Sequence, residues 1–381
     1  MRVSVLQENL QRALNIVTRA VPSRPTLPIL NNVMISTDNA RIKLSATNLD
    51  LGIHVWIGGS VDEEGATTVP AKLFYDLVSI LSPERIDLNL DKRTQTLYLH
   101  CGGNNNQIKC IDAVEFPIIP EADASTGIAV PALEFKRMIE LVAFSASKEE
   151  NKPVLAGILT RMEGNTLIMA ATDGYRLSEC RAVLERGATT SFQVIIPARA
   201  LFELSRIISD ADEDVLISLP EGRRQVMFHL NNVDVVSSLI DGTFPDYERA
   251  IPKNFQTITT VYTEDLLRSA RRAAIFARDN ADTTQMHIRP PEGTHTHGEV
   301  VLSSSSAEKG SNESLIDASV EGAPLEIALN VRYLLEVLGV VGDDQIEICT
   351  NTSSDACLIR PYHNDEYRQF QHVIMPMRIN N

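Results

Sequence analysis

The 381-residue sequence has little of what marks secreted, membrane-spanning or disulfide-stabilised proteins. Its 5 cysteines are an odd number without Cys-x-x-Cys spacing, which disfavours both a disulfide framework and a structural zinc site. No apolar run approaches the ~20 residues that a membrane span needs, and the N-terminus lacks the apolar block of a signal peptide. We therefore expect a cytoplasmic protein with reduced, buried thiols and no membrane contact.

Positive charge is also scarce, with Lys+Arg 35 against Asp+Glu 50 and a formal net charge of −15. Such a balance disfavours a nucleic-acid partner if the charge is evenly spread. However, six segments with helical periodicity together carry more basic than acidic residues, so the remainder is strongly acidic. Helix preference explains this only partly, because Glu favours helices as much as Lys and Arg do. The pattern favours one helix-lined surface that tolerates phosphates.

Catalytic motifs are missing as well. The sequence contains no phosphate-binding Gly-rich loop and no His-Glu-x-x-His. His295 and His297 lie in a polar stretch expected to be a solvated loop, 210–214 reads as a charged turn, and 303–306 reads as a loop. We expect no catalytic residue, no metal and no cofactor. A DNA-modifying enzyme with a diffuse metal site and a purely structural oligomer remain alternatives.

An internal repeat is the strongest pattern that is present. Landmarks recur in the same order at intervals of about 130 residues, which indicates triplication. The anchors are Leu10, Phe135 and Leu266 in a first strand–helix unit, Phe74, Leu201 and Leu334 in a second, and Pro117, Pro245 and Pro376 at the expected end of a late strand. A fourth landmark is shared by Ala46–Asp50 and Ala171–Tyr175. We predict three domains, over residues 1–123, 125–248 and 250–381.

The periodicity within each copy predicts an α+β fold. Apolar residues with helical spacing predict helices over 6–19, 71–81, 132–147, 198–208, 263–278 and 330–338. Alternating or β-branched runs such as 86–90 and 96–100 predict strands. Each domain should therefore combine two helices with several mostly antiparallel strands.

Five motifs in order resemble one known family, the bacterial sliding clamp, which is the beta subunit of DNA polymerase III. They are Arg24-Pro-Thr-Leu-Pro-Ile-Leu30, Thr67-Thr-Val-Pro-Ala-Lys72, Ala171-Thr-Asp-Gly-Tyr-Arg-Leu177, Asp241-Gly-Thr-Phe-Pro-Asp-Tyr247 and Val373-Ile-Met-Pro-Met-Arg378. The resemblance covers the whole chain. It implies the DNA clamp fold: two chains of three similar domains closed head to tail into a ring, with helices around the hole.

The resemblance also implies a non-catalytic processivity factor that encircles duplex DNA without sequence preference. Its implied partners are a second copy of the chain, the DNA polymerase III alpha subunit, the clamp loader, and other clamp-binding polymerases and repair proteins. The DNA-contacting candidates are Arg24 and the loop residues Lys148 and Lys152 by their match to the family, and Lys72, Lys136, Arg137, Arg199 and Arg206 by helix position.

A peptide-binding cleft is implied by position as well. Its residues are Leu155, Thr172, Gly174, Tyr175, Arg176, Leu177, Pro245, Arg249, Asn330, Tyr333, Val373, Ile374, Met375, Pro376, Met377 and Arg378. A simple Asp-Gly turn at 172–177 and an edge strand ending at Pro376 are the structural alternatives. The implied dimer contacts are Ile108 and Lys109 on one copy and Ile275 and Phe276 on the other, with core packing as the alternative for Ile275.

Overall fold

The computed structural model describes residues 1–121, 127–149, 151–185, 191–210, 214–220, 222, 224–292, 297–363 and 368–378. It divides into two compact units, Met1–Phe135 with Glu203–Leu239, and Lys136–Phe202 with Ile240–Asn381. Among the described strands, the pairings between neighbours are antiparallel, so the predicted α+β class is confirmed. None of the described helices is long and apolar enough to cross a lipid bilayer.

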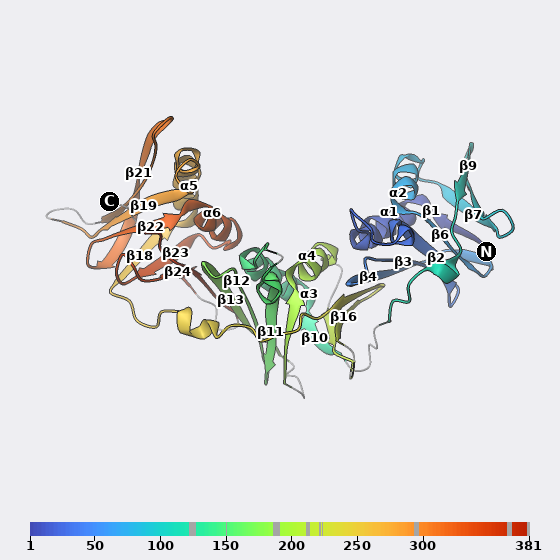
Figure 1. Cartoon of the computed structure of the whole chain (residues 1–381), viewed down its shortest axis with the longest axis horizontal. Coiled ribbons are helices and arrows are strands. Elements are labelled where there is room, and N and C mark those ends of the chain that lie inside the picture. The colour runs from blue at the N-terminus through green and yellow to red at the C-terminus, as the bar shows by residue number, and fades with distance from the viewer. Residues whose placement is uncertain are drawn as a thin grey trace. The chain divides into compact units, whose positions relative to one another are not determined.

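The first unit contains two sheets, which Figure 1 shows in its blue, teal and yellow-green parts. The smaller sheet has the order β5 (Ser60–Glu63), β1 (Arg2–Leu6), β7 (Arg85–Asp91), β8 (Thr96–Cys101) and β9 (Asn104–Lys109). The larger sheet has the order β10 (Ile128–Pro131), β15 (Asp214–Ser218), β16 (Gln225–Leu230), β17 (Val233–Ser238), β4 (Leu51–Ile57), β3 (Arg41–Thr47), β2 (Asn32–Asp38) and β6 (Ala66–Pro70).

Two helices of the first unit pack side by side, α1 (Gln7–Val17) and α2 (Ala71–Ile80). The buried side of α1 includes Leu10, Leu14 and Val17, so the predicted helical spacing places these apolar residues on one face. That face lies against β3 and β4. Burying such a face, rather than intrinsic propensity, stabilises a helix of this length.

The second unit is built on one sheet that runs through most of its length. Its order is β14 (Phe192–Pro197), β11 (Gly157–Glu163), β12 (Thr166–Thr172), β13 (Arg176–Val183), β25 (Arg368–Ile374), β24 (Cys357–Pro361), β23 (Gln345–Thr350), β18 (Thr257–Tyr262), β21 (Gly310–Gly322), β20 (Gly298–Ser306), β19 (Thr283–Arg289) and β22 (Leu325–Asn330). The helices α5 (Thr263–Ala277) and α6 (Val331–Val340) pack together in this unit.

The remaining helices are shorter or lie where the division between the units falls. The helices α3 (Ala132–Val142) and α4 (Ala198–Ile207) each span one of these division points. The 3-10 turns are η1 (Thr18–Ala20), η2 (Pro28–Asn31), η3 (Ala113–Glu115), η5 (Ala143–Ser145), η6 (Pro153–Ala156) and η7 (Tyr247–Ala250). All six predicted helices are therefore present, although 143–147 continues as a 3-10 turn and a bend instead of α-helix.

The repeated strand–helix units are confirmed as β1–α1, β10–α3 and β18–α5, and as β6–α2, β14–α4 and β22–α6. Two other predictions are wrong. Pro117 and Pro245 follow irregular segments and only Pro376 follows a strand, since the chain bends around apolar clusters before the first two. The Ser303–Ser306 segment is the end of β20, because it pairs with β21 in a long hairpin. His295 and residues 211–213 lie outside the described residues.

Candidate functional site

The turn between β12 and β13 is built from side-chain hydrogen bonds to the backbone. Asp173 Oδ1 accepts the amides of Tyr175 at 2.9 Å and Arg176 at 3.0 Å. Thr172 Oγ1 accepts the amide of Gly174 at 3.0 Å and donates to the Arg176 carbonyl at 2.6 Å. Gly174 has a φ of 93°, a left-handed conformation that glycine adopts without a Cβ penalty. The predicted turn is confirmed, and it presents Tyr175 to solvent.

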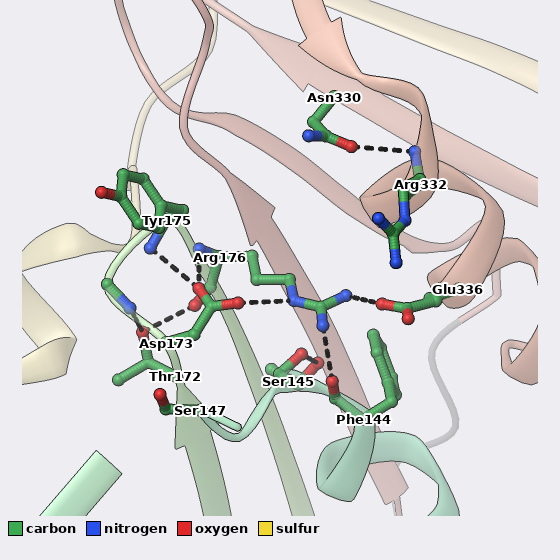
Figure 2. Close-up of polar contacts among 12 residues, drawn as sticks. Phe144, Ser145, Ser147, Thr172, Asp173, Tyr175, Arg176, Asn330, Arg332 and Glu336 are labelled. Carbon is green, nitrogen blue, oxygen red and sulfur yellow. Dashed lines mark hydrogen bonds and ion pairs between the residues drawn. The ribbon is translucent and has the colours of Figure 1, made fainter. Parts of the chain in front are cut away.

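Arg176 joins this turn to two other elements, as Figure 2 shows. Its Nε donates to Asp173 Oδ2 at 3.0 Å, its Nη1 donates to Glu336 on α6, and its Nη2 donates to the Phe144 carbonyl at 2.7 Å. The guanidinium also lies 4.4 Å from the ring centroid of Tyr333. The residue is only 5 % exposed, so it acts mainly as a buried connector and offers few donors to a ligand.

A polar cavity of about 250 Å³ adjoins this connector. It brings together the cleft candidates Tyr175, Arg176, Asn330 and Tyr333 with Lys148, which the sequence analysis assigned to DNA. Its remaining lining is Ala146, Ser147, Glu149, Asp173, Asp282, Arg332 and Glu336. The Asn330 Oδ1 accepts the Arg332 amide at 2.9 Å, so Asn330 also caps α6.

An apolar cluster lies on the strands beside the turn. Leu177 and Val373 face each other across β13 and β25 in register and are 4 % and 1 % exposed. The cluster contains Leu159, Ala170, Leu177, Ile195, Phe244, Tyr247, Cys349, Leu358 and Val373, with Val154, Ile240, Ile251, Phe255, Ile258 and Ala356 partly exposed around it. Two residues next to the cluster in sequence are more accessible: Pro245, which follows Phe244, is exposed, and Leu155, which follows Val154, is half-buried. These partly exposed apolar groups can receive apolar anchors of a peptide.

The chain segment after β25 is fixed at two points. The Met375 amide donates to the Tyr175 carbonyl at 2.9 Å, and the Met377 amide donates to the Ala328 carbonyl at 2.8 Å. The Met375 side chain is 43 % exposed, whereas Ile374 is fully buried and belongs to the core rather than to a cleft wall. Pro376 and Met377 are half-buried, and Arg378 and Arg249 are exposed. Residues 379–381 lie outside the described residues.

Glu179 is a buried residue that hydrogen-bonds to Tyr247 of the apolar cluster, and it was not predicted from the sequence. It is 1 % exposed and accepts hydrogen bonds from Tyr247 Oη at 2.6 Å, Arg181 Nε at 2.8 Å and Gln371 Nε2 at 2.7 Å. Burial alone raises the pKa of Glu179, but these hydrogen bonds outweigh it and hold the pKa below its usual value. The available signal was an acidic residue two positions before Arg181, within a segment of strand length.

The residues predicted to contact DNA differ in their exposure and in their contacts within the chain. Arg24, Lys72, Lys148, Lys152, Arg199 and Arg206 are exposed. Lys152 forms an ion pair with Glu149 at 3.1 Å. Lys136 is half-buried, and so is Arg137, whose Nη2 donates to the Val341 carbonyl at 2.5 Å beyond α6. Arg137 therefore has an internal structural role in addition to any external one.

The dimer candidates are also unequal. Ile275 on α5 is 58 % exposed, so the core-packing alternative for it is wrong, whereas Ile108 on β9 is 3 % exposed within its own sheet. Lys109 donates to Thr96 Oγ1 at 2.9 Å, and Phe276 is half-buried. Both β9 and the 310–318 part of β21 lie at a sheet edge, since each pairs on one side only. Leu315 on that part of β21 is 63 % exposed and was not predicted.

Comparison with known proteins identifies the family. Models of the N-terminal, central and C-terminal domains of the DNA polymerase III beta subunit match residues 1–120, 129–246 and 248–378. The beta sliding clamp of Synechococcus elongatus is 31% identical over 386 residues that cover 100% of both chains. The chain belongs to the beta sliding clamp family. Another relative, the Haemophilus influenzae clamp, is 29% identical over 380 residues and 100% of both chains.

A solved clamp has the same fold. The crystal structure of the Bacillus subtilis sliding clamp superimposes with a TM-score of 0.92 at 28% identity and covers 100% of this chain and 99% of that one. As a clamp of this family, the chain is a non-catalytic accessory subunit, and the comparisons do not support the DNA-modifying alternative. Among the described residues, no group of three or more His, Cys, Asp or Glu side chains is placed to hold a metal ion.

Proposed function

We propose that two copies of this clamp close head to tail around duplex DNA and tether the replicative polymerase to it. The observation that supports this most is the ordered match of all three beta-subunit models along the whole chain. We also propose the domains 1–123, 125–248 and 250–381 and a cytoplasmic location. The two compact units divide the chain elsewhere because β17 pairs with β4 and β13 with β25, so the sheets continue across the proposed domain boundaries.

For DNA, the proposal relies on phosphate contacts that carry no sequence information. The exposed candidates Lys72, Arg199 and Arg206 lie on helices, in agreement with a basic helix-lined surface on an acidic protein, and the exposed Arg24 lies in the loop between η1 and η2. Lys136, Arg137, Lys148 and Lys152 are proposed as further contacts.

The deciding experiment loads the protein on nicked circular DNA and then linearises the circle. Retention on the circle and release after cutting are expected, because encirclement and not direct affinity holds the DNA. Direct binding to linear duplex should be weak, should fall with salt, and should weaken further in Arg24→Ala. Tight, sequence-selective binding to linear duplex would contradict the proposal.

For closure of the ring, we propose that the β9 edge of one copy meets the α5 and β21 region of its partner. Two unpaired edges joined across copies remove exposed edges from both. In sedimentation experiments, Ile275→Asp with Phe276→Asp should convert dimer to monomer. Ile118→Asp is the matched control, because Ile118 is 96 % exposed and lies outside β9, α5 and β21, so it should leave the dimer intact. Persistent dimer in the double variant would place the interface elsewhere.

For partner proteins, we propose that the apolar cluster and the Met375–Arg378 segment form a cleft for short peptides with a Gln and spaced Leu or Phe residues. The proposed donors of such peptides are the polymerase alpha subunit, the clamp loader, and other clamp-binding polymerases and repair proteins. The support is the convergence of Tyr175, Leu177, Pro245 and Met375 from separate parts of the chain. A flexible, exposed methionine suits peptides of varied shape.

Calorimetry with a Gln-Leu-x-Leu-Phe-type peptide tests the cleft. Deleting 375–381 should abolish binding while dimer and DNA retention persist, since the cleft uses different residues. Met375→Ala should weaken binding roughly tenfold through lost apolar contact. Val183→Ala is the control, because Val183 is 41 % exposed at the other end of β13. Equal affinity in the intact and deleted proteins would exclude this cleft.

A further inference from the structure

The first unit contains a second cavity, of about 400 Å³, that the proposed function does not use. Its floor is formed by Val55 and Ile57 at the end of β4 and by Val233 at the start of β17. Ile16 on α1 and Ile207 at the end of α4 form apolar walls. This volume lies within the range of about 300–1,000 Å³ that is typical of small-molecule sites.

The polar residues in the described lining of this cavity are neutral or positively charged. Among the described residues that line it, Arg12 is the only charged one, and the other polar ones are Asn9, Ser209, Asn231 and Asn232. On a protein with a net charge of −15, a cavity whose described lining has one cation and no carboxylate favours an anion. Arg12 is exposed, and its Nη2 donates to Asn9 Oδ1 at 2.9 Å. A guanidinium has five N–H donors, so others are left for a ligand.

The repeat offers an internal comparison. Arg12 and Arg137 each lie two residues after the matched anchors Leu10 and Phe135. In the second unit, Arg137 is half-buried and donates to the Val341 carbonyl at 2.5 Å, and its Nη2 lies 2.8 Å from where a Cβ on Gly342 would be. The Arg137 guanidinium therefore packs against Val341 and Gly342 of its own chain, whereas Arg12 lines a cavity.

We propose that the cavity beside Arg12 binds a small amphipathic carboxylate, with its apolar body among Ile16, Ile57 and Ile207 and its carboxylate on the Arg12 guanidinium. Arg–carboxylate pairs are charge-assisted and commonly bidentate, which sets the orientation of the ligand. The asparagine amides at the rim can accept or donate further hydrogen bonds.

The test uses the full-length dimer with isoleucine methyl labelling and two probes of equal shape, 3-phenylpropionate and 3-phenylpropanamide. The carboxylate should shift the methyl signals of Ile16, Ile57 and Ile207 and should bind roughly tenfold more tightly than the amide. Arg12→Gln should remove that preference without weakening the amide. Arg206→Gln, which removes the same charge from a residue outside the lining, should keep the preference.

A second variant separates filling of the cavity from loss of charge. Ser209→Phe places a ring at an exposed lining position, so it should block both probes while the protein stays folded. The proposal is overturned if neither probe shifts these methyl signals, if both probes bind equally to the unmodified protein, or if Arg12→Gln keeps the preference for the carboxylate.

Discussion

Two corresponding regions of the molecule, where β4 pairs with β17 and where β13 pairs with β25, have the same type of turn but different surfaces. The turn lies between β3 and β4 in the first region and between β12 and β13 in the second. In the first, Asn48 Oδ1 accepts the amides of Asp50 and Leu51, just as Asp173 accepts two amides in the second. After the turn, the first has Gly52 where the second has Leu177. The same turn and strand pairing can therefore support either a surface covered by the chain's own side chains or a surface open to a peptide.

In the first region, where β4 pairs with β17, the side chain that covers the surface is Ile119. A Cβ added to Gly52 would lie 2.5 Å from Ile119 Cγ2, so the isoleucine occupies the space above β4 where a side chain would otherwise project. The position matched to Ile119 in the second place is Tyr247, whose hydroxyl donates to buried Glu179. Its ring joins the apolar cluster with Leu177, and the surroundings stay partly exposed. This difference explains why only the second place is proposed to bind peptides.

The largest expected effect comes from a feature that both places share. Each holds a buried histidine bonded to a serine of the adjacent strand, His54 with Ser45 at 2.7 Å and His372 with Ser178 at 2.8 Å. Burial lowers the pKa of His54 to about 4, with help from Lys43, and that of His372 to about 3. Below pH 6.5 the unfolded chain binds protons that the folded chain does not. Stability should therefore fall from pH 6.5 toward pH 4, by up to about 1.4 kcal/mol per pH unit for each histidine.

Urea denaturation between about pH 7 and pH 5 measures this slope above most of the carboxylate range. His54→Gln and His372→Gln should each remove one histidine's share. An unchanged slope in the double variant would show that these histidines are not protonated on unfolding in this range.

The next effect distinguishes the second place. Arg176→Met removes a guanidinium bonded to Asp173, Glu336 and the Phe144 carbonyl and leaves those groups without it. We expect a loss of about 3 kcal/mol, because removing the buried guanidinium leaves two half-buried carboxylates without their cation. Hydrogen exchange at the β13 and β25 amides should report it locally. Arg332→Met is the control, since its ion pair with Asp282 is 3.5 Å long and its side chain is 67% exposed. Equal exchange in both variants would argue against the connector role.

A smaller effect should appear in the first place when its closed surface is disturbed. Gly52→Ala forces a methyl against Ile119 and should cost about 1–3 kcal/mol by overpacking. Adding Ile119→Ala makes room for that methyl, so Gly52→Ala should then cost much less. A double-mutant cycle with thermal denaturation measures this coupling. Strict additivity of the two substitutions would show that Ile119 does not close the surface.

The smallest effect concerns the turn itself. Leu49 has a φ of 83° and Gly174 a φ of 93°, so the first turn already accepts a side chain in the left-handed region. Gly174→Leu should therefore be tolerated at a cost of about 1–2 kcal/mol or less. Thermal denaturation and peptide calorimetry together check it, with Leu49→Gly as the reverse change. Failure of Gly174→Leu to fold would show that the two turns are not equivalent.

Local patterns made much of this architecture predictable. The helices, the strand–helix repeats and the turn at 172–177 follow from periodicity and from Asp-Gly turn chemistry within a few residues. Serine-rich residues 303–306 were misread because their strand character comes from pairing with β21 and not from their own preference.

Contacts between distant residues could not be predicted. The bond from Arg176 to Glu336, the burial of Glu179 under Tyr247 and the closing of Gly52 by Ile119 each join residues that are far apart in the chain. The resemblance named Arg176 as a cleft residue, but only packing shows that most of its donors point inward.

The position of β25 also bears on how the chain folds during its synthesis. This strand, Arg368–Ile374, lies in the middle of its sheet between β13 and β24, although it is the last strand that the structure describes. Until β25 has been synthesised, the β13 edge has no partner on that side, and an unpaired edge invites association with other chains. The second unit therefore completes its sheet only after β25 has left the ribosome, so a nascent clamp keeps an open edge long after β11, β12 and β13 have been made.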